Sequence, residues 1–382
     1  MKKVIVTGIT GQDGSYMAEK LLAMEDVLVY GMVRRTAQIH DGNFKHLLSN
    51  PRLKIVRGDL LDGTSLNALV QEIEPDYFIN FAAQSFVGDS WAIPEETFMA
   101  SAVGVLKCLE AIRKYRPSCR FYNAGSSEQF GDIIYAPQDE HHPFRPRSPY
   151  GAAKCAAHHL VKVYRESYNL YAIQGLLFNH ESERRGEEFV TRKITKGFAR
   201  IAKAIKDGLP FEPIHLGNID AKRDWSHASD FMDAIWRMLN QESYNPELSW
   251  IGEFDGADTM RYDLSKNIKE YVVASGESHT VREFISIVTH QLDYDCFWAD
   301  SGDKEKLIVN QDFVNRFSLK SNCLIQIDPK FYRPADVNTL LGTPAAITKE
   351  LGWKPQISFD KMVKLMLESD LHESGIISIS AS

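Results

Sequence analysis

The sequence predicts an α/β protein with a doubly wound parallel sheet and a smaller C-terminal lobe. Short apolar, β-branched runs alternate through the first half with stretches of helical spacing, as in repeated strand–helix units. The first run breaks at once into closely spaced glycines. Polar residues with useful chemistry stand at the ends of several runs, where doubly wound sheets bind their ligands.

Composition narrows the class of protein. The chain has 382 residues, 44% hydrophobic and 25% charged, which is typical of a globular protein. A net charge of −7 without a long basic run disfavours nucleic acid as a partner. No stretch approaches ~18 apolar residues, so no membrane span is expected. The chain starts on a strand, which leaves no room for a signal peptide.

The number and spacing of the cysteines indicate the cellular compartment. There are five cysteines, an odd number, and none has C-x-x-C spacing. This argues against a disulfide framework or a zinc site, and we expect no bound metal. Reduced thiols favour a cytoplasmic protein.

The first strand and the turn after it predict a phosphate site. Residues 3–7 form a β-branched run, residues 8–14 carry three glycines, and residues 15–24 have helical spacing. The glycines are spaced G-x-x-G-x-x-G rather than G-x-G-x-x-G. Glycine permits close backbone approach, and a helix N-terminus offers N–H groups to a pyrophosphate.

The second strand, 27–33, predicts the choice of dinucleotide. An NAD site would place an acidic residue near its end, but here Arg34 and Arg35 follow. Two cations suit a ribose 2′-phosphate, so we expect NADP. The alternative is a solvated surface pair.

Three further strands and a helix complete the predicted sheet. The strands are 53–60, 77–84 and 120–124, and the helix is 98–115. Asp59 at the end of one strand could reach an adenine amino group. The small Ala82 at the end of another would let a nicotinamide or ribose lie close.

The central segment carries the redox chemistry. Tyr150 and Lys154 lie four residues apart, on one helical face, and the cation favours the ionised phenol. Ser126 and Glu128 could complete a site for oxidation at an alcohol carbon and proton removal at its neighbour. Alone, Tyr-x-x-x-Lys would also suit an amphipathic helix with a surface lysine.

Several blocks together resemble one family in detail. They are residues 7–14, 80–88, 146–151, 177–182, 189–193, 217–225 and 331–334. The chain resembles the GDP-mannose 4,6-dehydratase family of the extended short-chain dehydrogenase/reductase superfamily, over most of 1–240 and again at 271–295 and 325–370. The resemblance implies a Rossmann-type NADP-binding domain at 1–178 that carries the catalytic residues. It also implies a nucleotide-sugar-binding lobe at 179–371, with some chain crossing back, and a tail at 372–382 that is open to disorder.

The resemblance implies a reaction and an assembly. GDP-mannose becomes GDP-4-keto-6-deoxymannose and water, a step toward GDP-fucose or another deoxyhexose. Tyr150 takes the 4-hydroxyl proton while hydride leaves C4, Glu128 removes the C5 proton, and the hydride returns at C6 after water is lost. Ser126 binds the 4-oxygen, and Lys154 holds the nicotinamide ribose. A homodimer or homotetramer is expected, with the loop at 34–36 near a neighbouring subunit.

Motif matches extend the predicted site. The expected cofactor contacts are Gly8, Thr10, Gly11, Gln12, Asp13, Gly14, Arg34, Arg35, Asp59, Leu60, Ala82, Gln84, Tyr150, Lys154, His180 and Arg185. The expected substrate contacts are Ser85, Ser126, Glu128, Asn179, Val190, Lys193, Gly217, Arg223, Arg333 and Asp336.

The chain departs from the family pattern at several places. Ser126 replaces a usual threonine, Gln129-Phe130 replaces an apolar–tyrosine pair, and Asp336 replaces a glutamate near the guanine pocket. Segments at about 244–269 and 297–323 have no counterpart. They are either surface loops or oligomer contacts, or they shape the sugar pocket.

Other functions remain open at this point. A related GDP-sugar, such as a GDP-manno-heptose, could be the substrate. A nucleotide-sugar 4-reductase or epimerase is a further alternative, and a non-catalytic nucleotide-sensing protein belongs to a different class.

Overall fold

A computed structural model describes residues 1–36, 40–241, 268–332 and 339–376. The chain divides into two compact units. The first comprises 1–178, 228–276 and 341–355, and the second comprises 179–227, 277–340 and 356–382.

The first unit is built on a seven-stranded parallel sheet in the order β11-β6-β5-β4-β1-β2-β3. The strands are β1 (Lys2–Thr7), β2 (Val27–Val33), β3 (Leu53–Arg57), β4 (Tyr77–Asn80), β5 (Arg120–Ala124), β6 (Ala172–Leu177) and β11 (Val272–Val273). Strands 27–33 and 120–124 were predicted with these bounds. The strands expected at 53–60 and 77–84 end earlier, at Arg57 and Asn80, so their last predicted residues belong to the loops at the carboxyl edge.

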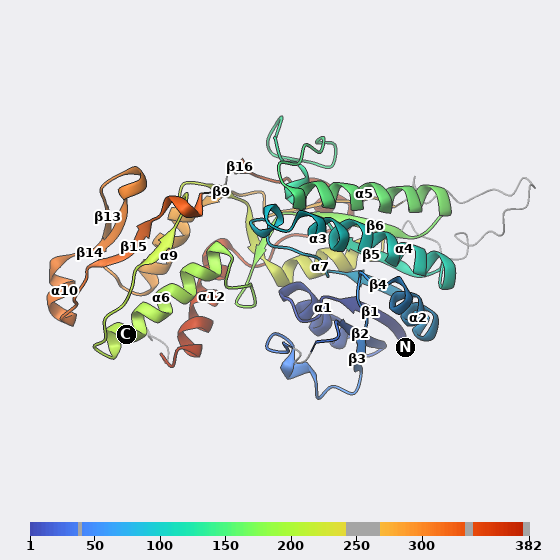
Figure 1. Cartoon of the computed structure of the whole chain (residues 1–382), viewed down its shortest axis with the longest axis horizontal. Helices are drawn as coiled ribbons and strands as arrows, with labels where there is room; N and C mark the ends of the chain where they lie inside the picture. The colour runs from blue at the N-terminus through green and yellow to red at the C-terminus, as the bar shows by residue number, and fades with distance from the viewer. Residues whose placement is uncertain (37–39, 242–267, 333–338, 377–382) are drawn as a thin grey trace, which may run out of the picture. The chain divides into compact units, whose positions relative to one another are not determined.

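Helices cover both faces of this sheet (Figure 1). One face packs on α1 (Gln12–Leu22), α7 (Ala228–Leu239) and α11 (Ala345–Leu351). The other packs on α2 (Gly63–Ile73), α4 (Gly104–Tyr115) and α5 (Pro149–Tyr168). Alternation along β1 decides the faces: Val4 and Val6 point to the first layer, and Ile5 points to the second. The predicted doubly wound parallel sheet is therefore confirmed.

The helix expected at 98–115 is longer and interrupted. It begins as α3 (Pro94–Phe98), continues through a π-helical turn, η3 (Met99–Val103), and ends as α4. Short 3₁₀ turns complete the elements of this unit: η1 (Lys45–Leu47), η2 (Asp89–Trp91) and η4 (Ser127–Gln129).

The second unit has its own core and three small sheets. β7 (Asn179–Glu181) pairs with β10 (Trp225–His227), and β9 (Lys222–Arg223) lies between β12 (His279–Thr280) and β16 (Thr339–Leu340). A four-stranded sheet has the order β13-β14-β15-β8, formed by Cys296–Ala299, Lys306–Val309, Cys323–Ile327 and Ile214–Leu216. The helices are α6 (Val190–Lys206), α9 (Val281–Gln291), α10 (Gln311–Phe317) and α12 (Phe359–Glu373), with short turns η5 (Gly302–Lys304) and η6 (Pro329–Phe331).

The unmatched segment at 297–323 is not a surface loop. It supplies most of β13, all of β14 and α10, and the start of β15, and Leu307, Val309 and Phe313 are buried in the core. The loop alternative for this segment is therefore wrong, because its alternating apolar residues complete a sheet. The other unmatched segment lies almost wholly outside the described residues.

The expected tail begins later than residue 372. Helix α12 continues to Glu373, and Ile376 is buried against the core of the second unit. Residues 377–382 lie outside the described part of the chain.

Candidate active site

The glycine turn between β1 and α1 leaves its backbone open. Gly8 has φ +68°, and a Cβ there would lie 2.9 Å from the Ala82 nitrogen. A Cβ on Gly14 would lie 2.3 Å from the Gly8 carbonyl oxygen. The N–H of Gly11 donates to that same oxygen at 2.9 Å. Only glycine fits this packing, and the arrangement brings the α1 N-terminus to a surface that a pyrophosphate could occupy.

Three arginines gather where β2 and β3 end. Arg34 and Arg35 are exposed directly after β2. Arg57, the last residue of β3, is paired in register with Val33, and its Nη1 donates to the Arg34 carbonyl oxygen at 3.0 Å. Arg57 was not among the predicted contacts, although its place at a strand end beside Asp59 was a usable signal. The cluster suits an anion such as a ribose 2′-phosphate.

Asp59, Leu60 and Gln84 differ in what they can offer a dinucleotide. The Asp59 carboxylate accepts the Leu61 N–H at 2.9 Å, which orients it. The Leu60 side chain is buried against Gly104, so only its main chain is available. The Gln84 Nε2 donates to the Phe86 carbonyl, while its Oε1 is buried and has no partner among the described residues. Such an orphaned acceptor, two residues after Ala82, fits a bound group that brings hydrogen-bond donors.

Helix α5 presents Tyr150 and Lys154 from its first two turns. Ser148 caps the helix by accepting the Gly151 N–H at 3.0 Å, and Pro149 is favoured at the first helical position. Tyr150 and Lys154 are both buried, and the Lys154 Nζ lies 5.6 Å from the Tyr150 ring centroid. That Nζ donates to the Ala124 carbonyl at 2.7 Å. Burial lowers the pKa of Lys154 to about 8.

Ser126 and Glu128 belong to a tight turn after β5. The Ser126 Oγ accepts the Glu128 N–H at 3.3 Å, and the Gln129 side chain accepts the Ser126 N–H at 2.9 Å, which forms a capping box on η4. The start of α5 lies against this turn, since a Cβ on Gly151 would be 2.7 Å from the Glu128 carbonyl oxygen. The structure therefore brings the elements that carry all four predicted catalytic residues together.

The second unit holds the remaining predicted contacts that the structure describes. Asn179 and His180 lie on β7, and the Asn179 Oδ1 is buried without a partner among the described residues. Arg185 pairs with the buried Glu181 at 3.2 Å, and its guanidinium lies 3.5 Å from the Phe189 ring centroid. Arg223 is buried on β9.

Two of these contacts converge on Phe331. The Lys193 Nζ, on α6, lies 3.6 Å from the Phe331 ring centroid. Burial and the nearby Lys330 cation lower the pKa of Lys193. A Cβ on Gly217 would lie 2.6 Å from the Phe331 carbonyl oxygen, so a glycine is required there. Val190 is partly exposed at the start of α6, and Arg333 and Asp336 lie outside the described residues.

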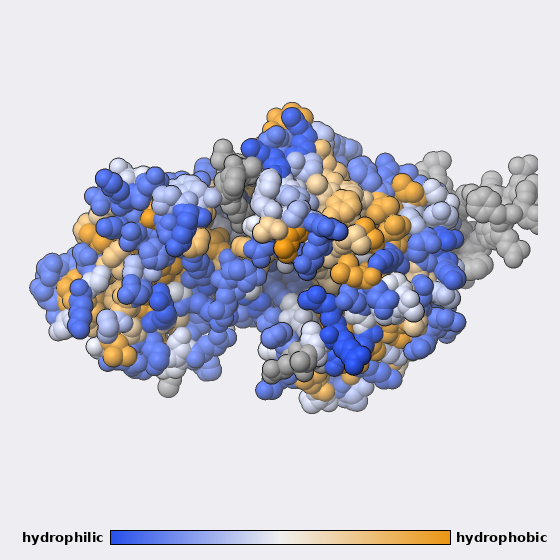
Figure 2. Space-filling view, viewed as in Figure 1, coloured by the Kyte–Doolittle hydropathy of each residue, from blue (hydrophilic) through white to orange (hydrophobic). Residues whose placement is uncertain are grey.

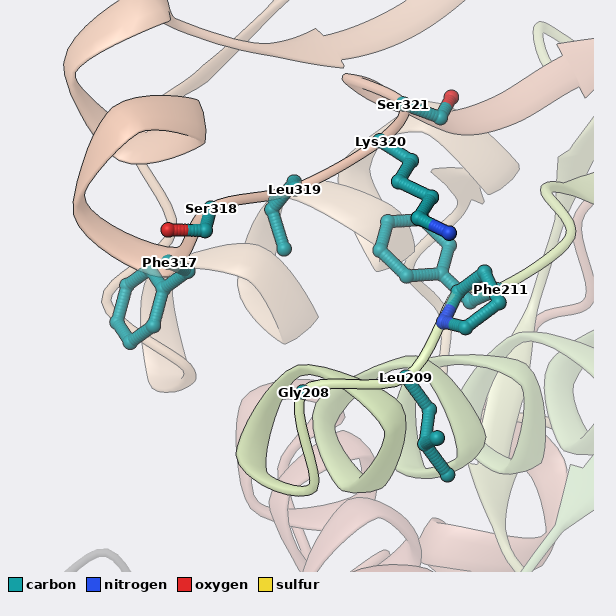
Figure 3. A pocket seen from close by; sticks show the side chains of 9 residues that line it. Gly208, Leu209, Phe211, Phe317, Ser318, Leu319, Lys320 and Ser321 are labelled. Atoms are coloured by element: carbon teal, nitrogen blue, oxygen red, sulfur yellow. The ribbon is translucent and has the colours of Figure 1, made fainter.

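A separate pocket in the second unit contains none of the predicted site residues (Figure 3). Residues 208–211 after α6 and residues 317–321 after α10 line it. Across the described ranges, no group of three or more histidine, cysteine, aspartate or glutamate side chains could hold a metal ion. No helix in those ranges is both long enough and apolar enough to cross a membrane.

Comparisons with known proteins agree on one family. A family model described as GDP-mannose 4,6 dehydratase matches residues 5–253 and 245–366. The chain is 39% identical over 378 residues to GDP-mannose 4,6 dehydratase of Drosophila melanogaster, covering 97% of this chain and 86% of that protein. It is 39% identical over 382 residues to GDP-mannose 4,6-dehydratase of Vibrio cholerae, covering 98% and 94%. The human protein of the same name is 38% identical, covering 96% and 91%.

Solved structures share the fold at lower identity. RMD from Pseudomonas aeruginosa, solved in complex with NADPH, is 22% identical with a TM-score of 0.69 and covers 98% of this chain and 100% of its own. UDP-glucuronic acid 4-epimerase from Bacillus cereus, solved with UDP-glucuronic acid and NAD, is 18% identical with a TM-score of 0.72 and covers 97% and 99%.

Proposed function

Because the chain belongs to the GDP-mannose 4,6-dehydratase family, we propose that it converts GDP-mannose to GDP-4-keto-6-deoxymannose and water with NADP as cofactor. The observation that carries the proposal is the packing of the Ser126–Gln129 turn against the start of α5, in a unit that also holds the open glycine turn. Reversible hydride transfer, out of C4 and later into C6 of the sugar, is the chemistry that bound NADP supplies.

Tyr150 and Glu128 of the first unit carry out different proton transfers. The Tyr150 phenol takes the proton of the sugar 4-hydroxyl, and Ser126 hydrogen-bonds the same oxygen. Lys154 favours the ionised phenol through its charge and holds the nicotinamide ribose. Once C4 is a ketone, the C5 hydrogen is acidic, and Glu128 removes it. Glu128 then gives this proton to the departing 6-hydroxyl, which leaves as water. C5 regains a proton when C6 is reduced. In net terms this is the proton that Tyr150 took from the 4-hydroxyl, so the phenolate is restored and the protons balance.

The proposal assigns binding roles to residues of each unit. Gly8 to Gly14 hold the pyrophosphate, and the arginines at the ends of β2 and β3 hold the 2′-phosphate that distinguishes NADP from NAD. The GDP-sugar is held by Asn179, Lys193, Gly217 and Arg223 of the second unit, with Arg333 and Asp336.

We further propose a cytoplasmic homodimer or homotetramer. Exposed apolar side chains support self-association: Phe98 and Met99 at the α3–η3 junction, and Val163 and Tyr168 on α5. Helices α3 and α5 pack together, and hydrophobic patches interrupt the hydrophilic surface of the first unit (Figure 2). Light scattering tests this point, and a monomeric active enzyme would contradict it.

The activity is tested by incubating the protein with GDP-mannose and detecting the 4-keto product by its absorbance in alkali. Parallel incubation with a GDP-manno-heptose tests the related substrate. In deuterated solvent, Tyr150→Phe should give no deuterium at C5, since C4 oxidation must come first. Binding of GDP-mannose without any product would instead support a sensing protein.

A further inference from the structure

Four adjacent strands of the first unit each place a polar residue at the same level of the sheet. Thr7 on β1 is paired in register with Asn80 on β4, Asn80 with Asn123 on β5, and Asn123 with Gln174 on β6. Each follows an apolar alternation that assigns it to the face covered by α5. None of the four is more than 2% exposed.

Hydrogen bonds join this row into one chain, which we call the amide relay. The Thr7 Oγ1 donates to Asn80 Oδ1 at 2.6 Å, and Asn80 Nδ2 donates to Asn123 Oδ1 at 2.8 Å. Asn123 Nδ2 donates to Gln174 Oε1 at 2.6 Å. Gln174 Nε2 donates to Gln129 Oε1 at 3.0 Å and to the Lys154 carbonyl at 3.2 Å.

Both ends of the relay receive backbone N–H groups of predicted site residues. The Ala82 N–H donates to Thr7 Oγ1 at 3.1 Å, which leaves the hydroxyl hydrogen available for Asn80. At the other end the Ser126 N–H donates to Gln129 Oε1, so Gln174 must present its Nε2 there. This end sets the direction of every amide, and the Thr7 hydroxyl is compatible with it, so one arrangement satisfies the whole relay.

Gln129 makes two hydrogen bonds and leaves one polar group unpaired. It is fully buried, and its Nε2 has no partner among the described residues. An apolar side chain of similar size would avoid that unpaired donor but would remove the acceptor of the Ser126 N–H and of the Gln174 Nε2. Gly125 leaves the room that Gln129 needs, because a Cβ there would lie 2.9 Å from Gln129 Oε1.

We propose that Gln129, held by the amide relay, is a positioning residue that fixes the Ser126 peptide and thereby the orientation of Ser126 and Glu128 toward the sugar. This rests on the proposed function. The relay also anchors Lys154, through its carbonyl, and Ala82, through Thr7. One row of side chains therefore holds Lys154, the turn that carries Ser126 and Glu128, and the loop at Ala82.

Two substitutions at Gln129 separate the effect of its acceptor oxygen from the effect of its side-chain shape. Gln129→Met keeps the length and removes the acceptor of the Ser126 N–H. Gln129→Glu keeps an oxygen at that position and replaces the unpaired Nε2 by a carboxyl oxygen, which at this buried site is expected to carry a proton. We expect kcat per NADP-loaded site to fall about ten-fold or more in Gln129→Met, with KM for GDP-mannose within about three-fold, and to recover in Gln129→Glu.

Amide hydrogen exchange gives a readout that does not depend on activity. The Ser126 N–H should exchange at least about ten-fold faster in Gln129→Met than in the unaltered protein, and Gln129→Glu should restore its protection. If Gln129→Met does not fold, Gln129→Asn, whose shorter side chain withdraws the acceptor, gives the same two readings.

Gln138 provides a matched control in the same unit. It is also fully buried, accepts the Leu341 N–H at 3.0 Å and donates to the Tyr135 carbonyl at 3.2 Å. Gln138→Met should lower the melting temperature without changing kcat per loaded site. If Gln129→Met keeps kcat and Ser126 protection, or loses activity only in step with Gln138→Met, the positioning role is wrong. An unaltered protein that is inactive on GDP-mannose, with Ser126 exchange still set by Gln129, would overturn the proposed function but support the relay.

Discussion

The two units position their candidate site residues by different means. In the first unit most of these residues follow parallel strands, whose shared register brings residues far apart in sequence to one edge, while Tyr150 and Lys154 lie on α5. In the second unit they lie on strands of two or three residues, on the connections between strands and at the start of α6. Local motifs therefore predict which elements of the first unit carry the candidate site residues. In the second unit the surroundings of each residue depend on contacts such as Lys193 with Phe331, which no local pattern contains.

The largest expected effect is in the first unit. Glu128→Gln should lower kcat by roughly 10²-fold or more while GDP-mannose binding stays nearly unchanged, because the amide keeps the shape but cannot accept the C5 proton. Steady-state kinetics and calorimetry measure the two quantities. Glu166→Gln, at a surface carboxylate that pairs with Lys162 on α5, is the control. Normal turnover in Glu128→Gln would remove this residue from the mechanism.

The next largest effect is expected on cofactor affinity, also in the first unit. Replacing Arg34 and Arg35 by serine should weaken NADP+ at least about ten-fold more than NAD+, since only NADP+ carries the 2′-phosphate. Arg57→Ser should add to the loss, because this guanidinium lies beside Arg34. Titration calorimetry with both cofactors is the measurement. Equal affinity of the unaltered protein for NAD+ and NADP+ would contradict the assignment.

Substitutions at the candidate site residues of the second unit should change substrate binding alone. Lys193→Met should raise KM for GDP-mannose by about ten-fold with little change in kcat, because the proposed role of this charge is to hold the nucleotide and not to act on the bonds that change. Lys196→Met on the same helix is the matched control, since its ammonium pairs with Glu187 at 2.6 Å and Glu373 at 3.3 Å. A fall in kcat as large as the rise in KM would mean that Lys193 acts on the transition state.

The burial of Lys154 should make the free energy of unfolding depend on pH. Its pKa is about 8 in the folded protein, below the usual value of 10.5, so between these values the unfolded chain binds more protons. The free energy of unfolding of the unaltered protein, compared with that of Lys154→Met, should therefore rise from pH 7 to pH 9.5 by up to about 2 kcal/mol. Urea unfolding at both pH values measures the difference. A constant difference would show that burial does not depress this pKa.

The smallest effect is expected for the segment at about 244–269. The Gln241 side chain donates to the Lys269 carbonyl at 2.8 Å and accepts the Lys269 N–H at 3.0 Å, so the two flanks are held together. Deleting 244–267 should keep GDP-mannose turnover within a fewfold and cost little stability, because loop length contributes weakly to closure entropy. Deleting 297–323 should instead unfold the second unit. A folded 244–267 deletion that lost turnover would give the segment a role at the sugar.

Sequence alone determined the elements whose signals are local. The β-branched runs, the glycine turn, the cations after β2 and the Tyr150–Lys154 spacing each depend on neighbouring residues, and the doubly wound sheet follows from their order. The resemblance supplied the family and most of the second-unit contacts. The sequence did not reveal the fold of 297–323, because its strands are short and the sheet they join is completed by β15 pairing with β8, far back in the chain.

Tertiary structure alone decided which polar residues act together. Thr7 and Asn80 end their strands, Asn123 and Gln174 lie within theirs, and singly each is an ordinary polar residue of an apolar strand. Parallel pairing across four strands puts them in one row, and the start of α5 then packs beside the turn that holds Gln129. Register between distant strands is set by the packing of both sheet faces, which no single segment specifies. The relay therefore exists only in the folded chain.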